Sequence, residues 1–154
     1  MESVWDYPRP PRLEQSTARV TVVHAGRTIV SSTRCLRVLE TSHPPVYYVP
    51  RSDITPDVLV PGEGRSVCEF KGVAQYWDLT VDTADRVRQV GWSYERPVAA
   101  FAALAGAVAF YPSRVDECRI DGELVRPQEG DFYGGWITDD ITGPFKGAPG
   151  TMGW

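Results

Sequence analysis

The clearest β signal in the chain is the stretch SVCEFKGVAQYWDLTV, residues 66–81. From Val73 onward its side chains alternate between two faces, because successive residues of a β-strand point to opposite sides of a sheet. One face carries Val73, Gln75, Trp77, Leu79 and Val81, and the other carries Ala74, Tyr76, Asp78 and Thr80. The residues before Gly72 form a second strand, so the stretch predicts a β-hairpin and, with it, a mainly β fold.

Segments on both sides of this hairpin repeat the β signal. Residues 86–93 are expected to pair back onto it, and residues 19–24 and 27–30 to form a hairpin around Ala25-Gly26. Further strands are expected at residues 36–40, between Pro45 and Pro50, at residues 107–111 and at residues 116–121, where Asp121-Gly122 predicts another hairpin turn. One short helix is expected within residues 97–105. We therefore expect antiparallel β-hairpins with a single short helix.

Turn residues divide the chain into three parts. Its 154 residues suit one domain with one core. Residues 1–18 are expected to form an extended arm, since three closely spaced prolines exclude a helix or a central strand. Residues 19–125 make up the β domain. Residues 126–154 are an irregular tail, rich in glycine, proline and aromatic residues, that is expected to pack on the domain or on a neighbouring subunit.

Composition argues against several functional classes. A net charge of −4 disfavours a protein that binds duplex nucleic acid, because such binding relies on neutralising phosphates. No stretch approaches the roughly 18 to 20 apolar residues that a membrane span requires, and no signal peptide is visible. The three cysteines, Cys35, Cys68 and Cys118, lack the paired spacing of a zinc site. We expect a cytoplasmic protein with no metal, no cofactor and no membrane partner.

Lysine use is uneven. Only Lys71 and Lys146 are lysines among 16 basic residues, and both lie in the tripeptide Phe-Lys-Gly. Lysine is a compact, titratable point charge, whereas arginine is a permanently charged fork. A chain that uses arginine elsewhere but keeps lysine here is expected to need an amine, although two occurrences also fit chance. Lys71 is therefore a candidate ligand-binding or catalytic residue.

Cys68 and His43 are further candidates. An ammonium near Cys68 would lower the pKa of the thiol and make it a nucleophile. However, Cys68 and Lys71 nominally face opposite ways unless Gly72 marks a bulge, and a buried structural cysteine is the alternative. His43 precedes two prolines in a rigid, extended setting, where it would act as a general base or contact an anion. A loop histidine bonded to the backbone is the alternative.

Aromatic residues are candidates for a ligand-binding wall. Four of them, Tyr47, Tyr48, Trp77 and Trp92, would line a cavity for a flat ligand, and core packing is the alternative for each of them. Because neighbouring residues of a strand alternate, only one of Tyr47 and Tyr48 is expected to face the core. The other is expected to look outward, toward solvent, a ligand or a partner.

Two runs carry a family resemblance. The runs SHPPVYYVP (residues 42–50) and CEFKG (residues 68–72), with Ala74, Tyr76 and Trp77 after them, resemble the family catalogued as domain of unknown function 427. The resemblance covers residues 19–123. It implies the β-tent architecture shared with methionine sulfoxide reductase B and a small zinc-containing exchange-factor relative, here without the zinc ligands that those relatives often carry.

The family is also labelled nucleotidyltransferase-like. Nucleotidyl transfer generally needs carboxylates that hold a divalent metal beside the phosphates. The close aspartate pairs of this chain, at positions 53 and 57, 82 and 85, and 139 and 140, all lie in expected turns or in the tail. The label therefore has little support in the residues themselves.

Three functions stay open at this point. The first is a small-molecule binding domain whose pocket holds an anionic or flat ligand, such as a nucleotide; its expected ligand-binding residues are His43, Tyr47, Tyr48, Lys71 and Trp77. The second is an enzyme that uses Lys71 or Cys68 in the same pocket. The third is a structural homodimer joined through the aromatic tail and outward tyrosines.

Overall fold

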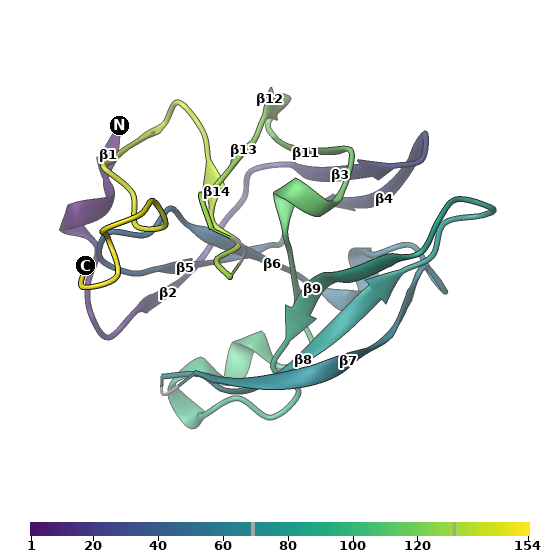
Figure 1. The fold of residues 1–154 in the computed structure, drawn as a ribbon, viewed down its shortest axis with the longest axis horizontal. Helices are drawn as coiled ribbons and strands as arrows, with labels where there is room; N and C mark the ends of the chain where they lie inside the picture. Colours follow the sequence, from purple (N-terminus) through teal and green to yellow (C-terminus); the bar gives the residue numbers. More distant parts are fainter. Residues whose placement is uncertain (69, 131) are drawn as a thin grey trace.

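A computed structural model describes residues 1–68, 70–130 and 132–154 and shows a mainly β protein, as the sequence predicts. The largest sheet has seven strands in the order β2-β5-β6-β10-β9-β8-β7, and a second has four in the order β12-β11-β3-β4 (Figure 1). The strands of the large sheet are β2 (Arg12–Gln15), β5 (Leu36–Leu39), β6 (Val46–Val49), β7 (Leu59–Cys68), β8 (Gly72–Leu79), β9 (Val87–Ser93) and β10 (Val108–Phe110). Those of the smaller sheet are β3 (Val20–His24), β4 (Arg27–Ser32), β11 (Glu117–Ile120) and β12 (Glu123–Leu124).

The hairpin predicted over residues 66–81 is formed by β7 and β8. The two strands pair antiparallel up to Cys68 and Gly72, and the Lys71 N–H donates to the Cys68 carbonyl across the turn at 3.3 Å. Gly72 has a φ of +118°, a conformation that L side chains rarely adopt. Lys71 thus lies in the turn and not on the strand of Cys68.

The expected helix within residues 97–105 appears as η3 (Ala99–Leu104), which is made of 3-10 turns. Phe101 and Leu104 are its buried residues, and their spacing of three matches the repeat of a 3-10 helix. Gly106, with a φ of +75°, follows directly after this segment. Phe101 has non-helical backbone angles (φ −118°, ψ 23°), so a kink at this residue divides the segment into two short turns. The other 3-10 turns are η1 (Val4–Asp6), η2 (Arg51–Asp53) and η4 (Pro112–Arg114).

Both faces of β6, inside the large sheet, are covered, which corrects one expectation. Tyr47 packs against Trp136 of the tail, with ring centroids 5.2 Å apart, and belongs to the core cluster shared with the four-stranded sheet. Tyr48 belongs to a second cluster on the opposite face, with Trp92 and Tyr94. Both tyrosines are buried, so the expectation that one of them faces outward is wrong: β6 lies inside the sheet, and each of its faces has its own apolar layer.

The N-terminal arm and the C-terminal tail lie against each other at the left of Figure 1. Strand β1 (Glu2–Ser3) pairs in parallel with β15 (Ile141–Thr142), and β13 (Arg126–Pro127) pairs antiparallel with β14 (Trp136–Ile137). The Trp5 ring contacts the Trp154 ring, with centroids 5.3 Å apart. The arm also contributes β2, which pairs with β5 at the end of the large sheet. In the described part of the chain, no helix has the length and apolarity needed to cross a membrane.

Candidate binding cleft

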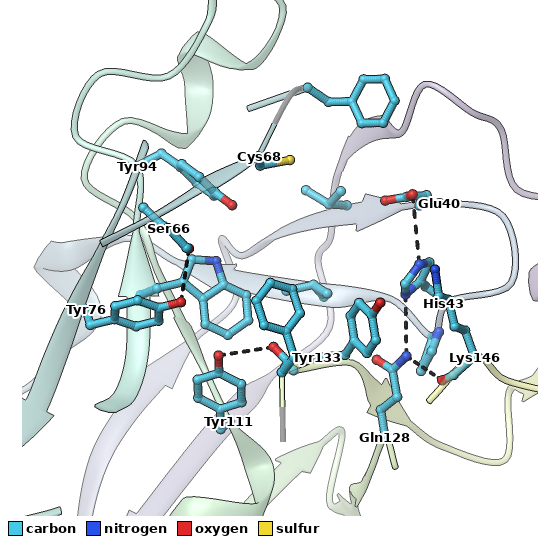
Figure 2. Close-up of a pocket in the computed structure, with 18 residues that line it drawn as sticks. Glu40, His43, Ser66, Cys68, Tyr76, Tyr94, Tyr111, Gln128, Tyr133 and Lys146 are labelled. Atoms are coloured by element: carbon cyan, nitrogen blue, oxygen red, sulfur yellow. Dashed lines mark hydrogen bonds and ion pairs between the residues drawn. The ribbon is translucent and has the colours of Figure 1, made fainter. Parts of the chain in front are cut away.

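A cleft of about 280 Å³ opens on the face of the large sheet that carries Tyr48 and Trp92. Its lining comes from β5, the β5–β6 turn, β7, β8, the ends of β9 and β10, and the tail (Figure 2). The lining residues are Val38, Glu40, His43, Pro44, Val46, Ser66, Cys68, Phe70, Ala74, Tyr76, Trp92, Tyr94, Tyr111, Gln128, Phe132, Tyr133, Gly134 and Lys146. Most of them are apolar or aromatic, as is usual for small-molecule sites.

One side of the cleft is an aromatic wall, formed by Tyr76, Trp92, Tyr94 and Tyr111. The Trp92 indole N–H donates to the Tyr48 hydroxyl at 3.1 Å, and the Trp92 and Tyr111 ring centroids lie 4.8 Å apart. Burial raises the pKa of Tyr111 to about 12 and also raises the pKa of Tyr94. These phenols are therefore neutral at pH 7, and the wall offers ring faces and neutral hydroxyls.

The other side is a polar end, formed by Glu40, His43, Gln128 and Lys146. The β5–β6 turn brings the first two together, because the His43 N–H donates to the Glu40 carbonyl at 3.0 Å. The Lys146 backbone N–H donates to the Ser42 carbonyl at 2.8 Å, which docks the tail onto the same turn. Figure 2 shows these four side chains gathered at the side of the cleft opposite Tyr76 and Tyr94.

The orientation of the Gln128 amide is determined by backbone groups. Its Oε1 accepts a hydrogen bond from the Gly135 N–H at 3.1 Å, and its Nε2 donates to the Lys146 carbonyl at 2.6 Å. The same Nε2 lies 3.4 Å from His43 Nδ1. Because Nε2 is a donor, His43 Nδ1 must be the acceptor, and the proton of the neutral imidazole then lies on its Nε2.

His43 is neutral at pH 7. Burial lowers its pKa to about 4, and the nearby charges of Lys146, Arg9 and Lys71 act in the same direction. His43 Nε2 is 3.9 Å from the Glu40 carboxylate, beyond hydrogen-bond distance. Glu40 is itself paired with Arg9 at 3.4 Å. The charges of Lys146, Arg9 and Lys71 thus disfavour a proton on His43, although the whole protein is acidic.

Lys146 provides the positive charge of the polar end. Its ammonium lies 5.6 Å from the centroid of the Tyr133 ring. Among the described residues, no carboxylate lies within ion-pair distance of it. Tyr133 in turn makes an edge contact with His43, with ring centroids 5.0 Å apart. An ammonium without a carboxylate partner, next to a neutral imidazole, can accept a negatively charged ligand group.

Two tail glycines allow the tail to approach the cleft closely. A Cβ on Gly134 would lie 2.5 Å from the Trp92 ring, and one on Gly135 would lie 2.5 Å from Gln128 Oε1. Such distances are too short for ordinary contacts, so any larger residue would shift its neighbour. The glycines therefore set the positions of the aromatic wall and of Gln128 relative to the tail.

The predicted site residues are only partly brought together. His43 and Cys68 line the cleft, whereas Tyr47, Tyr48, Lys71 and Trp77 are not among its lining residues. Tyr48 is buried beneath Trp92. The Trp77 indole N–H donates to the Ser93 hydroxyl at 2.9 Å. The Arg51 guanidinium lies over the Trp77 ring, 4.5 Å from its centroid, in a cation–π contact.

Lys71 is 8% exposed, with its ammonium 5.9 Å from the Phe101 ring centroid. It therefore acts on the cleft only through its charge, which contributes to the low pKa of His43. Its counterpart in the second Phe-Lys-Gly triplet, Lys146, is the lysine that lines the cleft. The two identical triplets did not distinguish the lysine that lines the cleft from the one that does not.

The cysteines differ in their surroundings. Cys35 and Cys118 are buried, and burial raises their thiol pKa to about 11 and about 12 respectively. Cys68 is half-buried at the cleft. Within the part of the chain that the structure describes, no group of three or more His, Cys, Asp or Glu side chains is arranged to hold a metal ion.

Comparison with known proteins identifies the family of the chain. No curated protein matches the chain. The sequence profile of the family described as "Domain of unknown function (DUF427)" matches residues 12–121, which is more than half of the chain. The match ends before Gln128, Tyr133 and Lys146, so part of the cleft lies outside it. The chain belongs to this family of domains of unknown function.

Proposed function

We propose that the protein is a small-molecule binding domain whose ligand is flat and negatively charged and occupies the cleft. The observation that carries this proposal is that the aromatic wall and the Lys146 ammonium line the same cleft. Aromatic rings contribute stacking and apolar area, and a partly desolvated ammonium contributes charge recognition. The three free cysteines are usual in a reducing compartment, which supports a cytoplasmic location.

The two lysines offer a matched pair of variants for the test. Thermal unfolding of the wild type is followed in the presence of a panel of flat acids and flat neutral compounds. A compound that binds the native state raises the melting temperature. We expect Lys146→Met to lose the shift that the acids produce and Lys71→Met to keep most of it, because only Lys146 lines the cleft. The absence of any shift in the wild type, or an equal shift in wild type and Lys146→Met, would refute the proposal.

A second candidate function is an enzyme that uses the Cys68 thiol, since this cysteine lines the same cleft. A Cys68→Ser variant separates the two functions. If the protein only binds its ligand, the variant keeps the thermal shift and no product forms from any bound compound. If the thiol is a nucleophile, a bound electrophilic compound is modified by the wild type and left intact by the variant.

A further inference from the structure

We infer that the cleft accepts a small aromatic acid, one flat ring system with a single carboxylate, and that the tail recognises the carboxylate. This inference rests on the proposed function and narrows its ligand. Three properties of the cleft carry it: its volume, the charges in its lining, and the hydrogen-bond donors at the polar end.

The volume limits the size of the ligand. About 280 Å³ lies just below the roughly 300–1,000 Å³ that is usual for small-molecule sites. One or two fused rings with a carboxylate fit into such a space. A nucleoside triphosphate, with its base, ribose and three phosphates, would have to extend beyond this space.

The charges in the lining match a single negative charge. Lys146 is the cation among the described lining residues, and none of those residues is an arginine. Glu40 is already paired with Arg9, and His43 is neutral. A monoanion leaves no charge uncompensated, whereas a phosphate dianion would leave one charge unpaired in a largely apolar cleft.

The donors at the polar end suit a carboxylate, which only accepts hydrogen bonds when ionised. Gln128 holds His43 in the tautomer with the proton on Nε2. That N–H has no described acceptor within hydrogen-bond distance, since Glu40 is 3.9 Å away. The Lys146 ammonium belongs to the same end of the cleft, and we infer that the two groups donate to the two oxygens of one carboxylate.

Half of the residues that form this end, Gln128 and Lys146, lie outside the family match. Gln128, Tyr133 and Lys146 belong to the tail, whereas the matched residues 12–121 include the aromatic wall and His43. The tail therefore sets specificity: the matched part offers an aromatic cleft, and the tail determines which polar group can enter it.

The test is a calorimetric titration of the full chain with 2-naphthoate, 2-naphthamide, phenyl phosphate and adenosine triphosphate. We expect 2-naphthoate to bind at least about tenfold more tightly than the amide of the same shape. In Lys146→Met this preference disappears while the affinity for the amide is unchanged. Lys71→Met is the matched control and keeps the preference, because this lysine does not line the cleft.

The outcomes separate the inference from the proposed function. Equal binding of the acid and the amide overturns the inference, and so does tighter binding of phenyl phosphate or adenosine triphosphate. In either case the proposed function, a cleft that binds a small molecule, still stands. Retention of the acid preference in Lys146→Met also overturns it. If none of the four compounds binds the wild type, both the inference and the proposed function fail.

Discussion

His43 shows at the residue scale how the cleft controls a side chain. Its sequence context, a rigid segment before two prolines, made it a candidate site residue, and the structure places it in the lining of the cleft. Its protonation state could not be predicted, because it depends on burial and on Lys146, Arg9 and Lys71, which are distant in the sequence. Long-range packing also decides which lysine lies at the cleft. Lys71 was the candidate predicted from the sequence, but identical triplets carry no information about which of the two side chains packs there.

The low pKa of His43 predicts a specific acid sensitivity. Its pKa is about 4 in the folded protein and about 6.5 when unperturbed, so the unfolded chain binds the proton more readily. Stability is therefore lost as the pH falls from about 6.5 to 4, by on the order of 3 kcal/mol at full extent. His43→Gln lacks this contribution, and its midpoint of urea unfolding should fall less between pH 7 and pH 4. Parallel pH profiles for the two proteins would contradict this account.

The three thiols should react in a fixed order. Cys68 is half-buried at the cleft, whereas Cys35 and Cys118 are buried and have raised thiol pKa values. Because the thiolate is the reactive form, we expect iodoacetamide at pH 8 to modify Cys68 first, as read by peptide mass spectrometry. A bound cleft ligand should slow this reaction in the native protein. Faster modification of Cys35 or Cys118 than of Cys68 would contradict the predicted order of reactivity.

At the scale of elements, local signals predicted the hairpins well. Alternation between residues 72 and 81 and the turn signals at Ala25-Gly26 and Asp121-Gly122 correspond to β8, to the β3–β4 hairpin and to the β11–β12 hairpin. The register shift between β8 and β9 near Trp77 and Leu79 was not predicted. It surrounds Asp78, whose partners lie on β9 or just before it, so no pattern within β8 alone could reveal it.

Asp78 should stabilise this irregular part of the sheet. It is 1% exposed and accepts hydrogen bonds from the Gln89 N–H at 2.9 Å, the Arg86 guanidinium at 2.9 Å and the Arg88 guanidinium at 3.2 Å. Burial opposes its ionisation, but these donors outweigh burial and the pKa of Asp78 is lowered. We expect Asp78→Asn to lower the free energy of unfolding by roughly 1–3 kcal/mol, measured by urea denaturation. Asp82→Asn, at an exposed aspartate, is the control; equal effects of the two changes would contradict the prediction.

Gly134 links the tail to the aromatic wall. An added Cβ would lie 2.5 Å from the Trp92 ring, so Gly134→Ala should displace this ring. We expect the variant to keep its fold, judged by far-UV circular dichroism, and to lose about tenfold or more in affinity for 2-naphthoate. Gly153→Ala is the matched control, because nothing lies within 4 Å of the added atom. Unchanged affinity in Gly134→Ala would mean that Trp92 does not shape the ligand site.

At the scale of the whole molecule, the cleft is a product of long-range packing. The sequence predicted a mainly β fold, and membership of the family is confirmed. The division into arm, β domain and tail stays a prediction. The meeting of Lys146 and Gln128 with the β5–β6 turn could not be predicted, because irregular chain carries no periodicity from which contacts can be inferred.

The most direct test of the binding cleft is a nuclear magnetic resonance titration of the ¹⁵N-labelled full chain with 2-naphthoate. The indole N–H signals report on each tryptophan, and Trp92 alone among the five lines the cleft in the described residues. We predict that the Trp92 indole and Gln128 amide signals shift together and saturate, while those of Trp5 and Trp77 stay in place. A saturating shift at Trp5 or Trp77 with Trp92 unmoved would contradict the central claim.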